Sequence, residues 1–368
     1  MFIRILVVLL SSLLAGQAVA QDKTTISDQR QQPALKIGVI LGLTGPAGAW
    51  AKYSRIGLEL AARRLNETGG VAGRRVELLI EDSQSNPTAG VSAWRKLTAI
   101  DKVDAVVGDI WGFLTNPLIP LSKKTSKLLI APSYHWNEDP RNQYFFTLGQ
   151  KVSNTRSAVQ TFFTLHPSAK KIAVICWDDP WGGAYLKIWK EVAQELGRSI
   201  VYESCTSDFS YDYRTDVAKV QASGAEALLF AHHTERIVRS MRELQFALPL
   251  LTTSNMVEVF NDGSLPANLA EGIFFTDWPP SESYIKAYQT AYGEYPILQS
   301  ANSYDTLMAL ARAALANPAD LLKGLRTVHF SGASGPIDFR TSFVVNEGQA
   351  ELMQVREGKL VKALPIHE

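Results

Sequence analysis

Short apolar runs alternate with amphipathic segments from Lys36 onward. The run KIGVIL at 36–41 predicts a fully buried strand, and further strands are predicted at 74–83, 103–109 and 127–133. Helical periodicity fills the intervals between them, at 54–70, 86–101 and 116–126. This alternation predicts βαβ units and a parallel sheet with helices on both faces.

A second series with the same alternation begins near Thr147. KKIAVIC at 170–176 is a predicted strand, 184–197 is a predicted helix, and strand and helix continue to alternate as far as LPLLTTS at 248–254. KIGVI at Lys36 and KIAVI at Lys171 each lead through a loop rich in Pro and Gly into a long helix. The chain is therefore predicted to form two α/β lobes of similar architecture.

The last part of the chain does not make a third lobe. A strand at 271–280 ends in Pro-Pro, two helices follow it, and the last strands are predicted near 337–343 and 351–356. The helices suit the first lobe, so several crossovers should form a hinge. We expect lobe 1 to comprise 35–147 plus 278–335, and lobe 2 to comprise 148–277 plus 336–368. Ligands of open α/β sheets bind at the carboxyl ends of the strands, which here should face a cleft between the lobes.

The first residues, MFIRILVVLLSSLLAGQAVAQ, have the pattern of a secretory signal peptide. Arg4 supplies a positive charge, 5–15 are apolar, and 18–20 form an A-x-A cleavage site. The alternative is a membrane anchor, but the apolar run is shorter than the roughly 20 residues that span a bilayer. We expect a signal peptide at 1–20, a flexible leader at 21–34 and a soluble exported product.

Charge and cysteine content narrow the function classes. The formal net charge is +1 with no long basic block, which argues against a nucleic-acid partner.

The two cysteines, Cys176 and Cys205, each end a predicted strand, and the strands are consecutive. If these strands are neighbours, a disulfide is within reach, and a pair of free buried thiols is the other reading.

A set of spaced residues gives the chain a family resemblance. These are Gly45-Pro46, Asn66, Gly69-Gly70, Gly73, Asp82, Pro87 and Gly108. With WDDPWGGAY, EGIFF and NSYDTL, they make the chain similar to periplasmic branched-chain amino acid binding proteins, the type I solute-binding components of ABC importers, over nearly its whole mature length. The resemblance implies two doubly wound parallel-sheet lobes joined by a multi-crossover hinge, a periplasmic monomer without a cofactor, a small-molecule ligand, and ABC permease subunits in the inner membrane as partners.

The resemblance also implies a ligand site between the lobes. Trp50 matches an aromatic residue over the ligand, Gly112 a serine that binds the amino acid carboxylate, and Asn255 lies near the acidic residue that pairs with the ammonium. The loop at 133–135 matches one that contacts the carboxylate and ammonium, and three further positions match aromatic residues. These implied contacts are Ser133, Tyr134, His135, Trp181, His232 and Tyr304.

Two departures from the family pattern weaken amino acid recognition. Gly112 has no hydroxyl group and Asn255 has no charge, so a buried α-ammonium would lose its counter-charge at a cost of several kcal/mol. Backbone N–H groups after Gly112 and Ser133, near helix N-termini, remain available to an anion. Aromatic residues in the predicted loops take the place of the lost anchors, and they are Trp50, Trp111, Phe113, Tyr134, Trp136 and Trp181.

Such rings suit a flat aromatic solute by stacking or a quaternary ammonium by cation–π attraction. The alternative is that about half of them are structural and pack under the loops or between the lobes. In WDDPWGGAY we expect Trp181 to touch the ligand, Trp177 to support it, and Asp178 or Asp179 to cap the following helix.

Catalytic readings find no support in the sequence. Adjacent residues His232 and His233 at a strand end point to opposite sides, and the motifs H-E-x-x-H, G-x-S-x-G and the Walker loop are missing. We therefore expect no catalytic residue and no metal site. The leading hypothesis is the solute-binding component of an ABC importer. A ligand sensor that presents its closed form to a membrane receptor or regulatory partner is the alternative, and an exported enzyme on the same fold is a third.

Overall fold

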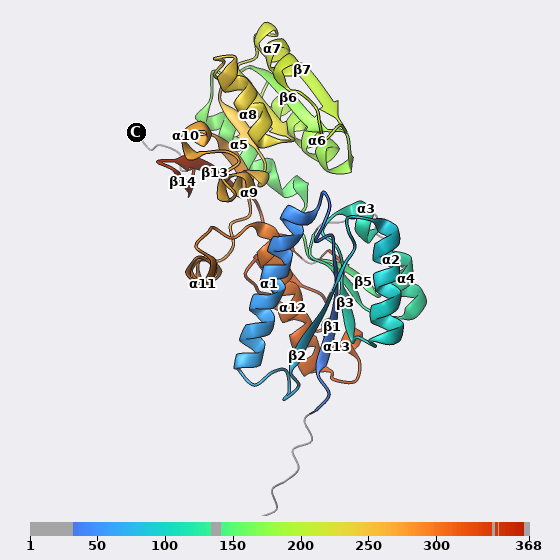
Figure 1. Cartoon of the computed structure of the whole chain (residues 1–368). Helices are drawn as coiled ribbons and strands as arrows, with labels where there is room; N and C mark the ends of the chain where they lie inside the picture. The colour runs from blue at the N-terminus through green and yellow to red at the C-terminus, as the bar shows by residue number, and fades with distance from the viewer. Residues whose placement is uncertain (1–31, 134–140, 341–342, 345, 364–368) are drawn as a thin grey trace, which may run out of the picture.

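The computed structural model describes residues 32–133, 141–340, 343–344 and 346–363. Figure 1 shows two lobes, one above the other, joined by segments that cross between them. The expected signal peptide and most of the expected leader lie outside the described residues. Within the described part of the chain, no helix is both long and apolar enough to cross a membrane.

Lobe 1 is built on a five-stranded parallel sheet in the order β2-β1-β3-β4-β5. Its central strand β1 is buried at nearly every position, as its continuous apolar sequence predicts. The strands are β1 (Leu35–Leu41), β2 (Val76–Asp82), β3 (Ala105–Val107), β4 (Leu129–Ala131) and β5 (Phe145–Thr147). The helices between them are α1 (Gly48–Glu67), α2 (Pro87–Arg95), the π-helical turn Lys96–Ile100, α3 (Gly112–Thr115) and α4 (Ile119–Thr125).

A later part of the chain returns to cover this sheet. The returning elements are α12 (Leu298–Ala316), α13 (Leu321–Leu325), β11 (His329–Ser331) and β12 (Pro336–Asp338). Helix α12 lies beside α1 in Figure 1, and the two backbones approach so closely at Gly57 that a side chain there would strike the Ser300 carbonyl. Glycine at this position therefore permits the helix contact.

Lobe 2 is built on a seven-stranded sheet in the order β14-β13-β10-β9-β8-β6-β7. Its first five strands in the chain are parallel, and β13 and β14 add antiparallel pairs at one edge. The strands are β6 (Lys171–Trp177), β7 (Ser199–Thr206), β8 (Ala227–Ala231), β9 (Leu250–Thr252), β10 (Phe274–Asp277), β13 (Glu351–Arg356) and β14 (Lys359–Lys362). The helices are the 3₁₀ turn Val152–Thr155, α5 (Arg156–Leu165), α6 (Pro180–Glu195), α7 (Arg214–Ala222), α8 (Thr234–Glu243), α9 (Asn255–Asn261) and α10 (Ala267–Ala270).

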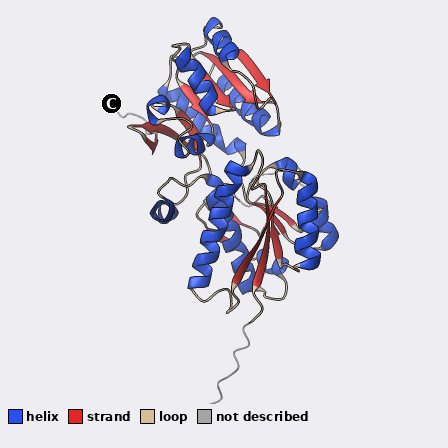
Figure 2. Cartoon of the chain, viewed as in Figure 1, coloured by secondary structure: helices blue, strands red, loops and turns tan. Residues whose placement is uncertain are grey.

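The chain passes between the sheets after β5, after β10 and again before β13, and α11 (Glu282–Tyr292) follows the second passage. The third passage starts later than the expected boundary at 335, because β12 pairs with β11 and Val344 still bridges to Thr147 of lobe 1. Figure 2 shows helices flanking each sheet. The predicted fold class, two parallel-sheet lobes joined by several crossovers, is confirmed.

Hydrogen bonds tie the crossing segments to one another. The side chains of Asn154 and Trp278 both donate to the carbonyl oxygen of Gly348, at 3.0 and 2.9 Å. Gln150 and Asn302 exchange two amide hydrogen bonds of 3.1 and 3.2 Å in a buried position. The hinge is therefore a hydrogen-bonded unit, in which the three passages contact one another or α12.

Candidate ligand-binding site

The carboxyl ends of the parallel strands of both lobes point into the space between the lobes (Figure 1). The loops that follow these strands therefore form the two walls of the candidate site, the arrangement expected for an open α/β sheet. Most of the residues singled out in the sequence lie on these loops or on the first turns of the helices that follow them.

The wall of lobe 1 carries three aromatic rings. Trp50, in the first turn of α1, and Trp111, just before α3, are half-buried and pack against the main hydrophobic core. Phe113 is 54% exposed, and its ring centroid lies 5.8 Å from that of Trp111. Of these three predicted contacts, Phe113 has the most free aromatic surface.

The loop that carries Trp111 is anchored by a buried acid that was not expected from the sequence. Asp109 follows β3, accepts a hydrogen bond of 2.9 Å from the Ser83 hydroxyl, and accepts one of 2.8 Å from the Ile110 N–H. Burial raises the pKa of Asp109 to about 6 despite these hydrogen bonds. Its carbonyl also accepts from the Thr115 hydroxyl at 2.8 Å. An acid placed directly at the end of a buried strand was the available signal.

The expected anion site near Gly112 is weakened by the length of α3. Gly112 opens this helix, which has only four residues, so few peptide dipoles align behind its N–H groups. In the second expected loop, the carbonyl of Ser133 accepts a hydrogen bond from the Thr147 hydroxyl. The expected contacts Tyr134 and His135 lie outside the described residues, as does Trp136.

In lobe 2, the stretch WDDPWGGAY forms the end of β6 and the start of α6. Asp179 caps the helix, because its carboxylate accepts from the Gly182 N–H at 2.7 Å. A side chain at position 182 would strike the carbonyl of Trp177, so glycine permits this close turn. Trp181 is half-buried and packs against a hydrophobic cluster in lobe 2 that includes Ile172 and Trp189. Its ring meets that of Tyr185 edge-to-face, with centroids 5.0 Å apart.

His232, an expected ligand contact, is only 1% exposed and has hydrogen-bond partners inside the lobe. Its Nε2 donates to the carbonyl oxygen of Thr206 at 3.2 Å, and its Nδ1 accepts from the Tyr213 hydroxyl and the His233 N–H. This pattern requires the neutral ring with its hydrogen on Nε2. Burial is the main reason that the pKa of His232 falls to about 3, so the ring stays neutral at ordinary pH.

The role expected for Trp177 is different in the structure. Its ring stacks on His232 with centroids 3.5 Å apart and meets Phe209 at 4.6 Å, whereas the ring partner of Trp181 is Tyr185. Trp177 therefore supports a histidine rather than Trp181. The reason is that β6 and β8 are neighbours in the sheet, so the last residue of β6 and the residue that follows β8 lie side by side.

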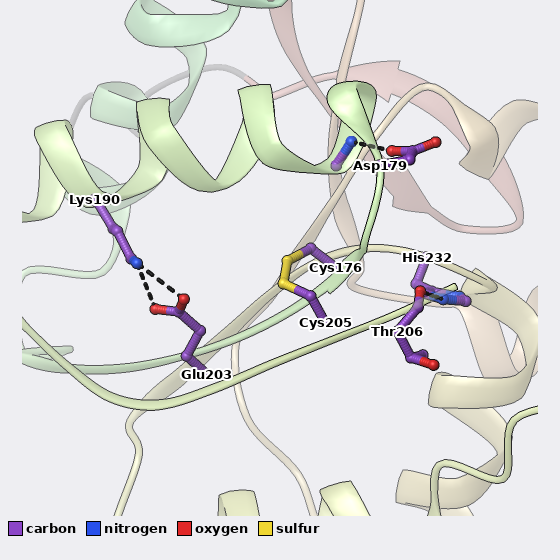
Figure 3. Close-up of a disulfide and its surroundings, with 8 residues drawn as sticks. Cys176, Asp179, Lys190, Glu203, Cys205, Thr206 and His232 are labelled. Carbon is purple, nitrogen blue, oxygen red and sulfur yellow. Dashed lines mark hydrogen bonds and ion pairs between the residues drawn. A yellow bond between two sulfur atoms is a disulfide. The ribbon is translucent and has the colours of Figure 1, made fainter. Parts of the chain in front are cut away.

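A disulfide joins Cys176 to Cys205. The two residues are directly opposite each other in the register of β6 and β7, and their Cα atoms are 4.5 Å apart. Figure 3 shows the bridge between the Lys190–Glu203 ion pair on one side and the Thr206–His232 contact on the other. Of the two readings of the cysteines, the structure contains the bridge.

Helix α9 carries an acid close to the position where a charge was expected to be lost. Asn255 is the first residue of α9, and Glu258 follows one turn later on the same side of the helix. Glu258 is 7% exposed and has no hydrogen-bond or ion-pair partner among the described residues. Burial, reinforced by Asp262 and Glu235, raises the pKa of Glu258 to about 8.

This side of α9 is turned toward lobe 1. Glu258 is among the acids that, after burial, help to raise the pKa of Tyr53 on α1 to about 12. Tyr53 lies one turn after Trp50 on that helix. Glu258 therefore lies near the aromatic wall of lobe 1. The sequence pattern gave no sign of this, because an acid in a short amphipathic helix is usually exposed.

Tyr304 does not lie at the walls of the site. It is 7% exposed within the contact of α12 with α1, and its hydroxyl accepts from Arg64 Nη1 at 2.9 Å. Arg64 is about 21 Å along α1 from Trp50, at 1.5 Å per residue. The described geometry gives Tyr304 a packing role between helices, contrary to the expected ligand contact.

Within the described residues, no group of His, Cys, Asp and Glu side chains is arranged to hold a metal ion. The walls carry aromatic surfaces, two buried acids, Asp109 and Glu258, and buried groups that hold the loops in place.

Comparisons with known proteins identify the family. The periplasmic binding protein family model matches residues 34–359. The chain is 25% identical over 308 residues to Leu/Ile/Val-binding protein homolog 1 of Brucella suis, covering 79% of this chain and 81% of that protein. It is 23% identical over 348 residues to the leucine-, isoleucine-, valine-, threonine- and alanine-binding protein of Pseudomonas aeruginosa, covering 90% and 91%.

Solved structures share the fold. The substrate binding protein LivJ of Streptococcus pneumoniae, in complex with isoleucine, superposes with a TM-score of 0.78 at 21% identity, covering 90% of this chain and all of that one. A solute binding protein of an ABC transporter from R. palustris, in complex with benzoate, superposes with a TM-score of 0.75 at 16% identity, covering 89% and 95%. The chain belongs to the periplasmic binding protein family, as a leucine-binding-protein-like type I solute-binding protein of the ABC transporter kind and not an enzyme.

Proposed function

We propose that this protein binds an aromatic or quaternary-ammonium-like solute between its lobes, in preference to a plain branched-chain amino acid, and delivers it to the permease of an ABC importer. It does so as a monomer in the periplasm, after removal of a signal peptide at 1–20. No cofactor takes part.

The observation that carries this proposal is the gathering of aromatic rings on both walls of the site. Lobe 1 contributes Trp50, Trp111 and Phe113. Lobe 2 contributes Trp177, Trp181 and Phe209. A flat ring gains about 0.5–1.5 kcal/mol from each well-placed aromatic neighbour beyond its buried area, and a cation gains about 0.5–2 kcal/mol over each ring face.

The polar groups of the walls support the same class of solute. Gly112 and Asn255 cannot supply the hydroxyl and the charge that an amino acid headgroup uses in the family. Glu258 is an acid in a buried position near α1, and a cationic group on the solute would lower its raised pKa and pair with the resulting carboxylate. The R. palustris relative in complex with benzoate is an example of this fold holding an aromatic ring.

Lobe closure explains how binding leads to delivery. A solute that contacts both walls binds the closed arrangement better than the open one, so it shifts the population toward closure. The permease then recognises the two lobes only in the geometry that closure creates.

A thermal-shift screen tests the proposal. Leucine, valine, benzoate and choline are each added at a large excess, where a ligand at 100 times its Kd stabilises the folded protein by about 2.7 kcal/mol. We expect benzoate or choline to raise the Tm by several degrees. Strong stabilisation by leucine or valine, with none by the other two, would refute the proposed ligand class. Mass spectrometry of the solute that co-purifies with the protein identifies the natural ligand directly.

A further inference from the structure

Three rings of lobe 2 form a stack that runs from the core to the surface. His232 is buried, Trp177 lies on it with centroids 3.5 Å apart and an interplanar angle of 23°, and Phe209 lies 4.6 Å from Trp177. Phe209 is 56% exposed. We call His232, Trp177 and Phe209 the lobe 2 ring stack.

The inner end of the stack is fixed by hydrogen bonds from several elements. Thr206 at the end of β7 accepts from His232, and Tyr213, just before α7, donates to it. Trp177 is the last residue of β6. The buried ring is therefore held by groups from two neighbouring strands and one loop, and its position determines where Trp177 and Phe209 lie.

The Cys176–Cys205 disulfide lies directly beneath this arrangement. Trp177 follows one cysteine and Thr206 follows the other, so the bridge joins the two residues that precede the partners of His232. Among the described strands, β7 is the edge of the sheet with β6 as its only neighbour, and no residue in β7 is fully buried. The disulfide is thus the covalent tie that keeps the end of an edge strand in register (Figure 3).

The exposure of Phe209 is unusual for its location. Of the large hydrophobic side chains that are exposed in the described part of the chain, the aliphatic ones lie at the C-terminal ends of helices, and they are Ile100, Leu196, Leu244 and Leu315. Those ends are at the far side of each lobe, because the helices run back from the carboxyl ends of the strands. The two aromatic ones, Phe113 and Phe209, lie instead at the carboxyl ends of strands, on opposite lobes.

We infer that the lobe 2 ring stack, held in place by the Cys176–Cys205 disulfide, is the surface on which a flat ring of the solute lies, with Phe209 as the contacting residue and Phe113 of lobe 1 facing it. This inference rests on the proposed function. It adds Phe209 as a specificity-determining residue and the disulfide as a positioning element.

Isothermal titration calorimetry with ring-bearing probes of different charge tests the contact. The probes are benzoate, benzyl alcohol and phenyltrimethylammonium, with leucine as the aliphatic comparison. We expect Phe209→Ala to weaken binding of the ring probe that binds wild type by roughly 5- to 20-fold, the effect of losing an aromatic neighbour and its buried area. Phe209→Leu should lose a smaller part of the affinity for the ring probe, because leucine retains apolar area without a ring. Leu315→Ala removes a similarly exposed side chain at the far side of lobe 1 and should leave affinity unchanged.

Reduction tests the disulfide. Dithiothreitol supplies two electrons and two protons to the bridge, which leaves two thiols while the reagent becomes a cyclic disulfide. We expect the reduced protein to bind the ring probe at least fivefold more weakly at a temperature well below its Tm, with an unchanged far-UV circular dichroism spectrum. The variant Cys176→Ser combined with Cys205→Ser should behave as the reduced protein does.

A second readout needs no ligand. In the oxidised protein the buried ring of His232 is neutral at pH 5, since its pKa is about 3. If reduction loosens the end of β7, the pKa of His232 moves toward its ordinary value of 6.5, and its ring-proton resonances at pH 5 shift to those of imidazolium. If reduction lowers only the Tm, with affinity and these resonances unchanged, the disulfide merely stabilises the fold and its positioning role is refuted.

The outcomes separate the inference from the proposed function. Binding of a ring probe that is unaffected by Phe209→Ala refutes the stack as the contact but leaves the ligand class intact. Binding of leucine without any ring probe refutes both. Failure of all ring probes at 10-millimolar-scale concentrations also refutes the stack as a ring-binding surface, whatever the natural ligand is.

Discussion

Replacing Glu258 with glutamine should make the protein more stable than wild type at pH 8 and change little at pH 4.5. Glu258 is 7% exposed without a partner among the described residues, so the folded protein holds its proton more tightly than the unfolded chain does. With a folded-state pKa raised to about 8, the associated stability is fully present below pH 4.5 and is lost as the pH rises toward 8. Glutamine has nearly the shape of the protonated acid and keeps that stability at every pH.

The magnitude follows from the pKa values. The difference between the ordinary value of 4.5 and about 8 is worth about 5 kcal/mol, at 1.36 kcal/mol per pKa unit. This is an upper figure, reached only when the buried site stays closed to water. Even half of it would be a large share of the 5–15 kcal/mol that typically separates folded from unfolded domains.

Urea unfolding of wild type and Glu258→Gln at pH 5, 6, 7 and 8 measures the effect. Because Asp109 and Asp277 are also buried acids with raised pKa values, only the difference between the two proteins isolates Glu258. Glu67→Gln, at an exposed position on α1, is the matched control and should parallel wild type. Parallel curves for wild type and Glu258→Gln would refute the reasoning, because they would mean that Glu258 is as well solvated in the fold as in the unfolded chain.

Three further predictions concern WDDPWGGAY and the cysteines. Trp181→Ala should weaken binding of the ring probe that binds wild type by about tenfold, from lost aromatic contact, and equal affinity by calorimetry would exclude this residue from the site. Asp179→Ala should lower the free energy of unfolding by about 1 kcal/mol, because α6 loses its N-cap, and urea unfolding midpoints show whether it does. Thiol titration of the unfolded, unreduced protein should find no free thiol at Cys176 or Cys205, and two free thiols would contradict the bridge.

Much of the fold was predictable because strong local patterns coincide with buried strands. KIGVI and KIAVI lie in the strands β1 and β6. The helices after them were predicted but begin six and four residues earlier than expected, at Gly48 and Pro180. The three-residue strand β5 and the one-turn helix α3 were missed, since so few residues carry no periodicity. The third crossover was placed too early, because β11–β12 is a hairpin whose lobe depends on tertiary packing.

The candidate site was predictable only where local chemistry determines it. Asp179 caps α6 as an acid at that position should, and Trp181 follows on the first turn. Tyr304 was misplaced, because the family pattern gives a position in the chain but no depth within the helix contact. Trp177 and Glu258 depend on which strands and helices become neighbours, and this information is contained in the sheet order rather than in the local sequence.

We propose that the acid and the ring stack belong to one site, and this can be measured. Glu235, at the start of α8, lies 3.7 Å from His233 Nδ1 and contributes to the raised pKa of Glu258. His233 in turn meets Trp177 at 5.2 Å. In this proposal, one solute with a ring and a cationic group contacts Phe209 and approaches Glu258 together. For phenyltrimethylammonium at pH 9, above the pKa of about 8, we expect Glu258→Gln to weaken binding about 10- to 100-fold, the effect of removing a charged partner. Benzyl alcohol, which has the ring without the charge, should lose affinity with Phe209→Ala and not with Glu258→Gln. If both variants affect both probes equally, Glu258 acts through the fold and the cationic group has no partner there.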